Sequence, residues 1–170
     1  YKQAVTMLLT IPGIPQLYYG QELLMTGSTK EDFGYVRPDM PGGWNGDEIS
    51  VFQESGRTAM QQEAFNFMKK MLHWRKGNDA ISKGKMKHFM PRSNVYVYER
   101  SYNGKSILVI MNGVNKEVDL DLTFYKEVIG DRTNSKNVLT DSNVPLGKKL
   151  HLQPKEVPVS YTHLRAHETL

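Results

Sequence analysis

The sequence predicts an α/β segment followed by an all-β domain, and two observations lead to this. Over residues 1–78, apolar side chains recur at helical spacing on both sides of a long loop rich in Gly, Asp and Pro. From Ala80 onward the period changes to two, which is typical of half-buried strands. The change of period therefore marks the boundary between the two parts.

The first elements are predicted to be a short helix, a tight turn and a buried strand. One side of the helix is apolar, formed by Ala4, Val5, Met7, Leu8 and Leu9. Pro12 and Gly13 then end the helix and turn the chain. The apolar run 14–19 is bounded by a proline and by Gly20, which suits a buried strand. A long loop through Gly56 follows.

The helix after this loop has the clearest local signals. Thr58 and Gln61 have the spacing of a capping box, and Gly77 stands where a C-cap glycine is expected. A stripe of apolar and aromatic residues recurs at helical spacing, formed by Ala64, Phe67, Met68, Met71 and Trp74. We interpret this stripe as a packing surface rather than a ligand groove.

The period-two region predicts an antiparallel β-sandwich or half-barrel. The alternating residues 95–98 and the apolar run 106–111 flank an Asn-Gly turn at 102–105, a strong hairpin signal. Another alternating run, 117–122, places Val and Leu on one face and Asp and Glu on the other. Further strands are expected in two more segments, 137–139 and 149–152.

Composition excludes several functional classes. The chain has 170 residues, a formal charge of +4 and a pI of about 9.2. Its lysine cluster, Lys83, Lys85 and Lys87, alternates with other residues and is interpreted as one solvated face of a strand, not a nucleic-acid site. No apolar run is long enough to cross a membrane. With no cysteine there is no disulfide or thiolate metal site, and both oxidising and reducing compartments remain open.

Three motifs in order resemble the α-amylase superfamily, glycoside hydrolase family 13. They are TIPGIPQLYYGQE at 10–22, RPDMPGGWNGD at 37–47 and AFNFMKKMLHWRKGN at 64–78. The sequence is most similar to bacterial neopullulanases and cyclomaltodextrinases. The resemblance implies that residues 1–78 are the closing segment of a (β/α)8 TIM barrel, with its last helices and eighth strand. Residues 79–157 would then be the small antiparallel β-sandwich domain that follows the barrel.

The same resemblance implies an α-glucan hydrolase that cleaves α-1,4 bonds with retention. Its catalytic Asp, Glu and Asp would lie on earlier strands, upstream of Tyr1, so no catalytic residue is assigned and the chain alone is expected to be inactive. The substrate would be an α-glucan, and the parent could be a homodimer. No cofactor is expected, because the acidic pair 119–121 lacks the remainder of a calcium loop, although calcium occurs in parts of the superfamily.

The loop after the eighth strand is the candidate substrate-binding region. Arg37 and Asp39 could hydrogen-bond sugar hydroxyls, and Trp44 could stack on the apolar face of a sugar. Tyr19 and Glu22 would be delivered to the catalytic face of the barrel. Structural alternatives remain open: a loop-bracing pair for Arg37 and Asp39, a hydrophobic lid for Trp44, and a structural hydrogen-bond partner in the barrel seam for Glu22.

A second hypothesis is a non-catalytic carbohydrate-binding or interaction module. It would require an exposed aromatic platform in the β region, for which Tyr96, Tyr98 and Tyr102 are the candidates. Alternating tyrosines on a strand more often pack within a sheet.

The tail is predicted to lie outside the fold. Residues 159–169 resemble a translated sequencing adapter, so 158–170 is interpreted as an artefactual tail. His163 and His167 have the i, i+4 spacing of zinc ligands with Glu168 adjacent, but no third ligand is evident and no metal site is assigned.

Overall fold

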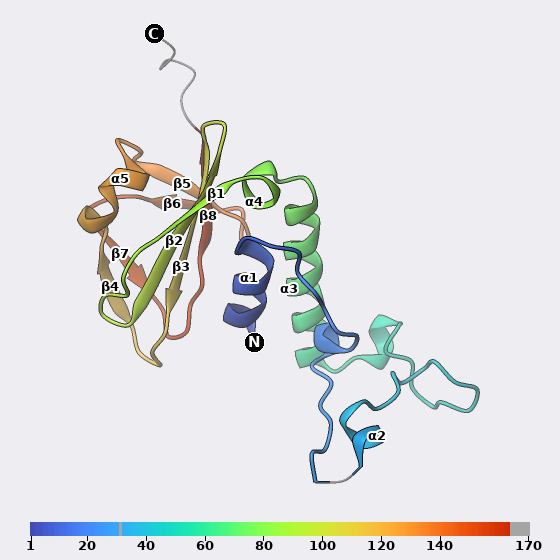
Figure 1. The fold of residues 1–170 in the computed structure, drawn as a ribbon. Coiled ribbons are helices and arrows are strands. Elements are labelled where there is room, and N and C mark those ends of the chain that lie inside the picture. Colours follow the sequence, from blue (N-terminus) through green and yellow to red (C-terminus); the bar gives the residue numbers. More distant parts are fainter. Residues whose placement is uncertain (31, 164–170) are drawn as a thin grey trace. The chain divides into compact units, whose positions relative to one another are not determined.

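The structure is a computed structural model that describes residues 1–30 and 32–163, which divide into two compact units (Figure 1). The first unit contains residues 1–14 and the chain from residue 71 onward, and the second contains residues 15–70. The first helix is grouped with the β region because it makes its contacts there, and the division at residue 78 stays a prediction.

The first unit begins with α1, Lys2–Thr10, as the sequence predicts. The buried strand predicted at 14–19 is wrong for this structure: the segment pairs with no other strand described here, and Ile14 is 98% exposed. A strand needs a neighbour to accept its backbone hydrogen bonds, and none of the described strands lies within residues 15–70.

The second unit consists of loops, three short helices and most of one long helix. The short helices are η1 Gln21–Leu23, α2 Phe33–Val36 and η2 Glu54–Gly56, and the long one is α3 Ala59–Lys76. Arg57 organises the end of the long loop: its guanidinium donates to the carbonyls of Val51 and Phe52, at 2.7 and 3.1 Å, and lies 3.7 Å from the centre of the Phe65 ring. The loop is therefore tied to the start of α3.

The capping box predicted at the start of α3 is confirmed. The Thr58 backbone donates to the Gln61 side chain at 2.9 Å, and the Gln61 backbone donates to the Thr58 hydroxyl at 3.2 Å. The predicted stripe is also largely buried, with Ala64, Phe67, Met68 and Met71 enclosed and Trp74 half-buried.

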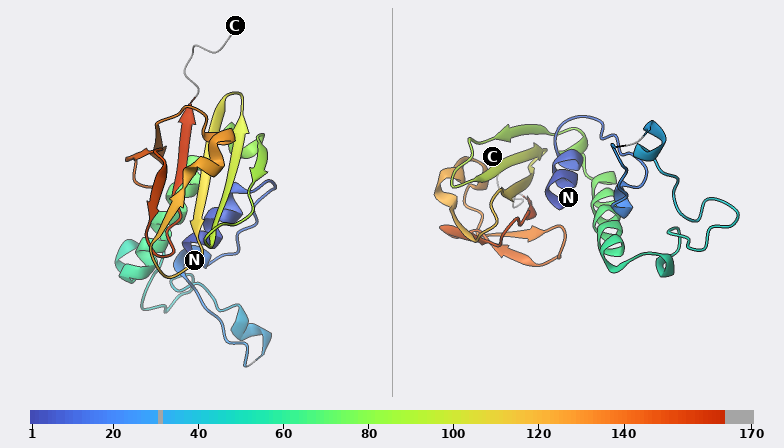
Figure 2. Two further views of the ribbon diagram at one scale, coloured as in Figure 1. Left: turned by 90° about the vertical axis from the view of Figure 1, so that its left-hand side faces the viewer. Right: turned by 90° about the horizontal axis from the view of Figure 1, so that it is seen from below.

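The β region forms a six-stranded sheet in the order β1-β2-β3-β8-β5-β6 and a two-stranded sheet of β4 and β7, with every pair antiparallel (Figures 1 and 2). The strands are β1 Lys85–His88, β2 Val95–Tyr102, β3 Lys105–Asn112, β4 Val118–Asp121, β5 Asn134–Asn137, β6 Asn143–Pro145, β7 Lys149–Leu152 and β8 Val159–His163. The predicted antiparallel β domain is thus confirmed. Asn103 and Gly104 have φ of 46° and 75°, as expected of the Asn-Gly hairpin turn.

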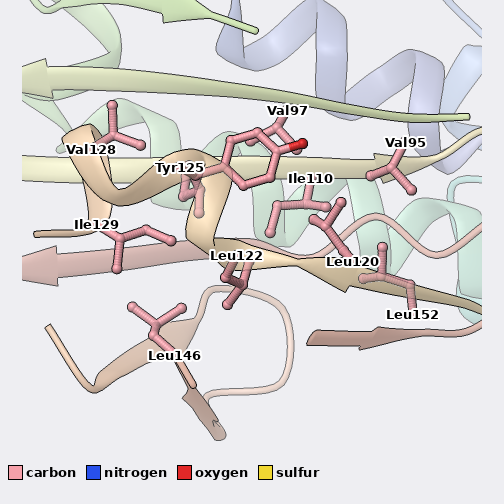
Figure 3. Close-up of a cluster of buried hydrophobic side chains, with 11 residues drawn as sticks. Val95, Val97, Ile110, Leu120, Leu122, Tyr125, Val128, Ile129, Leu146 and Leu152 are labelled. Atoms are coloured by element: carbon pink, nitrogen blue, oxygen red, sulfur yellow. The ribbon is translucent and has the colours of Figure 1, made fainter. Parts of the chain in front are cut away.

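One hydrophobic core lies between the two sheets (Figure 3). Val97 and Ile110 come from β2 and β3, and Leu120 and Leu152 come from β4 and β7, all 3% exposed or less. The segment η3 Leu122–Tyr125 and helix α5 Lys126–Ile129 add side chains to the same cluster. The alternation predicted at 95–98 and 117–122 therefore places its apolar faces on this core.

The opposite face of β2 carries polar groups that bind α1 and α4 Asp79–Ser82. Arg100, 2% exposed, donates to the carbonyls of Thr10, Ile81 and Gly84 at 2.6–2.8 Å. The Tyr98 hydroxyl lies 2.5 Å from the Thr10 hydroxyl, and burial raises the pKa of Tyr98 to about 12. The bonds to Thr10 link segments some 90 residues apart in sequence.

The structure extends the sheet beyond the expected end of the domain. Residues 159–163 form β8 between β3 and β5, with Val159 opposite Val109 and Tyr161 opposite Lys136. Alternating valine and tyrosine suit a strand, and backbone groups pair whatever the side chains. The origin of this segment as an adapter stays a prediction, and the tail from 164 onward, with His167 and Glu168, lies outside the described residues.

Candidate functional site

The five residues predicted to bind substrate all lie in the second unit. Tyr19 precedes η1, which contains Glu22, and Arg37 directly follows α2, with Asp39 two residues later. Trp44 lies in the turn after them. The structure brings three of the five together, as the following contacts show.

Tyr19 is the centre of this group. Its hydroxyl donates to the carbonyl of Pro38 at 3.2 Å, so its ring reaches the segment that joins Arg37 to Asp39. The Tyr18 ring lies beside it, with 4.6 Å between ring centres. Partial desolvation, then Tyr18 and then the Asp39 carboxylate raise the pKa of Tyr19, while the Arg37 guanidinium opposes them. Tyr19, Arg37 and Asp39 are therefore electrostatic neighbours.

Arg37 and Asp39 do not form the bracing pair that was left open. Both side chains are exposed, and within the described part of the chain no ion pair joins them. A guanidinium and a carboxylate that are not committed to each other present donors and acceptors to solvent. This is the donor and acceptor set that sugar hydroxyls require.

Trp44 lies in a turn that Asp47 holds. The Asp47 carboxylate accepts from the backbone of Gly42 at 2.6 Å and of Trp44 at 3.1 Å. Gly42 has φ of 94°, and a Cβ there would meet Ser50 at 2.4 Å, so the turn requires glycine. The Trp44 side chain is 67% exposed, so the turn presents the indole rather than burying it as a lid.

Glu22 is half-buried within η1, between Gly20 and Leu24, which both have positive φ. Among the described residues, no side-chain hydrogen bond of Glu22 is seen and none joins it to Tyr19 or Arg37. Its role, whether in binding or in the barrel seam, stays a prediction.

Two of the three tyrosines proposed for an aromatic platform, Tyr96 and Tyr98, pack within the fold. Tyr98 is fully buried against α1, and the Tyr96 ring packs 5.4 Å from it and 6.4 Å from His88. The Tyr98 hydroxyl is committed to Thr10, which removes it from any external ligand. The structure therefore counts against the carbohydrate-binding module.

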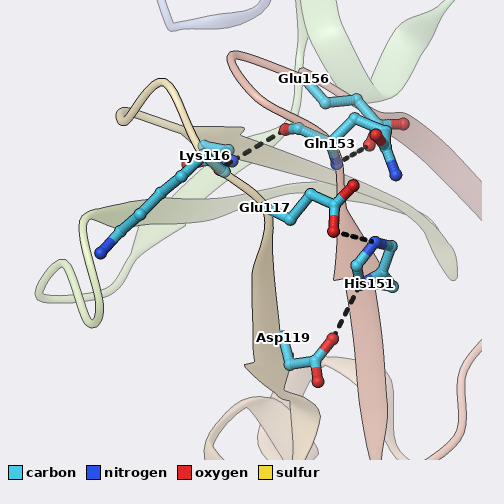
Figure 4. Close-up of polar contacts among 7 residues, drawn as sticks. Lys116, Glu117, Asp119, His151, Gln153 and Glu156 are labelled. Carbon is cyan, nitrogen blue, oxygen red and sulfur yellow. Dashed lines mark hydrogen bonds and ion pairs between the residues drawn. The ribbon is translucent and has the colours of Figure 1, made fainter.

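One polar cluster in the β domain was not predicted from the sequence (Figure 4). His151 on β7 contacts Asp119 on β4 at 2.8 Å and Glu117 at 3.6 Å. The Asp119 carboxylate raises the pKa of His151, and His151 in turn lowers the pKa of Asp119. The signal was the acidic face of 117–121, but only the register of β4 with β7 shows its partner.

Neither this cluster nor the loop amounts to a metal site. Over residues 1–30 and 32–163, no three His, Cys, Asp or Glu side chains lie close enough to hold an ion. In the same ranges, no helix is long and apolar enough to cross a membrane.

Solved structures superimpose on most of this chain. An α-amylase from Geobacillus thermoleovorans superimposes with a TM-score of 0.72 at 21% identity, over 94% of this chain and 32% of that one. The trehalulose synthase from Pseudomonas mesoacidophila gives 0.68 at 17% identity, over 94% and 37%. At these identities the likeness concerns the fold.

Two proteins are similar to this chain in sequence over most of its length. A cyclomaltodextrin glucanotransferase from Bacillus sp. (strain 6.6.3) is 32% identical over 151 residues, which are 84% of this chain and 18% of that protein. A cyclomaltodextrinase from Thermoanaerobacter pseudethanolicus is 28% identical over 155 residues, 90% of this chain and 23% of that protein. The chain thus spans about a fifth of the length of these relatives.

The fold and the sequence of this chain resemble the C-terminal region of proteins of the α-amylase superfamily, glycoside hydrolase family 13. More narrowly, residues 86–160 match the family described as the cyclo-malto-dextrinase C-terminal domain. The matched segment runs from β1 to the start of β8.

Proposed function

We propose that this chain is the C-terminal part of a retaining α-glucan hydrolase of the neopullulanase or cyclomaltodextrinase type. The parent would cleave α-1,4 bonds in maltooligosaccharides, pullulan or cyclodextrins. Support comes from the family of residues 86–160 and from the cyclomaltodextrinase among the relatives. Residues 1–78 would close a (β/α)8 barrel and 79–157 would form the domain after it.

The observation that carries the proposal is the grouping of Tyr19, Arg37 and Asp39. A phenol, a guanidinium and a carboxylate lie on one exposed loop, with the Tyr19 hydroxyl bonded to the Pro38 carbonyl at 3.2 Å. Such a group can donate to and accept from neighbouring sugar hydroxyls, and Trp44 offers an exposed ring for stacking. In this proposal these residues, with Glu22, bind the substrate and do not react with it.

The first test is catalysis by the chain itself. Retaining hydrolysis needs two carboxyl groups about 5 Å apart across the scissile bond, and the loop supplies only substrate contacts. The purified chain should release no reducing sugar from pullulan or cyclodextrin above a blank. Any hydrolysis by the purified chain would place the catalytic pair within it and overturn the division of roles, and its loss in Asp39→Asn or Glu22→Gln would locate that pair in the loop.

The second test is the reading frame upstream of Tyr1. The proposal expects it to encode the remaining strands of the barrel, with the catalytic Asp, Glu and Asp and an Asn-His-Asp motif. In that longer enzyme, Arg37→Ala should raise KM for maltooligosaccharides more than it lowers kcat. Arg92→Ala, an exposed arginine of the β domain, is the matched control, and an equal effect of both would contradict a binding role for Arg37.

A further inference from the structure

The β domain contains a pocket that the proposed function does not use. It has a volume of about 410 Å³ and opens beside the β2–β3 hairpin. Its walls include Lys85, Glu99, Ser101, Lys105 and Ser106, with Arg132 from the segment between α5 and β5. All of these belong to the first unit.

The sheet register explains why this pocket is polar. Lys85 on β1 lies opposite Ser101 on β2, and Ser101 lies opposite Ser106 on β3. Because opposite residues in an antiparallel pair share a face, these three and Glu99 lie on the face that carries Val97 and the core. The core-facing side of the sheet therefore changes from apolar to polar towards the hairpin.

The pocket carries an excess of positive charge. Lys85 and Lys105 are exposed and have no ion-pair partner among the described residues. Lys83, also on the wall, is paired with Asp79 at 3.1 Å. Against these stands one carboxylate of the wall, Glu99, which accepts from the Ser106 hydroxyl at 2.5 Å.

Arg132 adds a third cation that is only partly satisfied. One terminal nitrogen donates to the carbonyls of Val128 and Ile129, at 2.8 and 3.1 Å, which fixes the guanidinium at the pocket wall. Its Nε is enclosed and has no hydrogen-bond partner in the described structure. Arg132 therefore contributes its positive charge to the pocket wall.

We propose that this pocket binds a small anion of the phosphate type, either inorganic phosphate or the phosphate of a small polar molecule such as a sugar phosphate. Lys85, Lys105 and Arg132 would supply the charge, and the Ser101 hydroxyl a further donor. The volume of about 410 Å³ favours a single small group over an extended nucleic-acid backbone. The inference does not rest on the proposed function, because none of these residues belongs to the loop at 15–70.

The test is calorimetric titration of the purified chain at constant ionic strength, with inorganic phosphate, glucose 6-phosphate and glucose. We expect saturable one-site binding of a phosphate ligand and none of glucose. Lys85→Gln and Lys105→Gln should each weaken binding by about tenfold, while Lys148→Gln, an exposed lysine outside the pocket, should change it less than about twofold. Tighter binding of glucose 6-phosphate than of inorganic phosphate would identify the sugar phosphate as the ligand.

The variant Glu99→Gln distinguishes an electrostatic role of Glu99 in the pocket from a purely structural one. It keeps an acceptor for Ser106 but removes the negative charge, so phosphate should bind more tightly than to the wild type. Circular dichroism of each variant checks that the β domain remains folded. Equal weakening by Lys148→Gln and Lys85→Gln, glucose binding in place of phosphate, or no saturable binding would each overturn the proposal.

Discussion

The β domain and the segment 15–70 differ in how far their large apolar side chains are buried. In the first unit the large apolar residues are mostly buried, and many of them gather in a cluster between the two sheets. In the second, Phe33, Trp44, Ile49 and Phe52 are 58–80% exposed. Both segments are rich in apolar residues, so composition alone does not distinguish them.

This difference indicates that the β domain is stabilised by its own strands, whereas the segment 15–70 needs contacts from outside itself. The strands of the β domain supply each other's hydrogen-bond partners and share one core, whereas the loop has no sheet of its own. Exposed apolar groups on this scale are typical of an interaction surface. In the proposed parent enzyme, the remainder of the barrel would be the partner.

The largest expected effect comes from a matched pair of isoleucines, one in each segment. Ile110 is 1% exposed in the core and Ile49 is 58% exposed in the loop. Ile110→Ala should lower the free energy of unfolding by about 2–5 kcal/mol, because it leaves a cavity, and Ile49→Ala by less than about 0.5 kcal/mol. Urea unfolding followed by circular dichroism measures both. A similar loss for the two variants would remove the contrast between the segments.

A somewhat smaller effect is expected at the link between α1 and the β domain. Arg100→Met leaves the carbonyls of Thr10, Ile81 and Gly84 without their donor, which should cost at least about 2 kcal/mol of unfolding free energy. Arg92→Met, which only removes a guanidinium 4.0 Å from the Phe124 ring, should cost less than about 1 kcal/mol.

Amide exchange shows where the Arg100 variant loses stability. The amides of α1 should exchange faster while those of β4 and β7 change little, since Arg100 contacts α1 and α4 and not the two-stranded sheet. Unchanged protection of α1 would mean that these bonds do not hold the helix to the domain.

The smallest effect is the pH dependence of the exposed cluster on β4 and β7. The pKa of His151 is raised above its ordinary 6.5, so its contribution to stability is complete below that value and is lost as pH rises through the raised pKa. The pKa of Asp119 is lowered from 3.8, so its contribution is present above 3.8 and is lost on acidification. The pair therefore stabilises the fold most between the two ordinary values.

NMR titration of the His151 ring checks this directly. Asp119→Asn should bring the pKa of His151 down towards 6.5 and reduce the loss of Tm between about pH 6 and about pH 9. Asp131→Asn, an exposed aspartate outside the cluster, is the control. An unchanged His151 titration in Asp119→Asn would mean that the contact does not form in solution.

Local patterns in the sequence were sufficient for much of the fold. The capping box at Thr58 and Gln61, the Asn-Gly turn at 103–104 and the alternation around Val97 are each decided by residues close in sequence. The family resemblance added the order of the two parts. The capping box, the hairpin turn and the alternation are each determined by residues that are neighbours in the sequence.

The errors have the opposite origin. The run 14–19 has the composition of a buried strand, but a strand is defined by a neighbour that the segment does not have in this structure. The pairing of His151 with Asp119 and the position of β8 depend on strand register across 32 and about 50 residues. Among the site residues, the proximity of Tyr19 to Asp39 and the exposure of Trp44 both depend on the path of the loop, which the sequence did not determine.

The place of β8 in the sheet has a consequence for synthesis. Because β8 lies between β3 and β5, the two halves of the six-stranded sheet cannot join until residues 159–163 have left the ribosome. Until then the edges of β3 and β5 both expose unpaired backbone groups, which are templates for intermolecular pairing. Vectorial folding of the chain as given therefore ends with the insertion of a strand between two strands that are already formed.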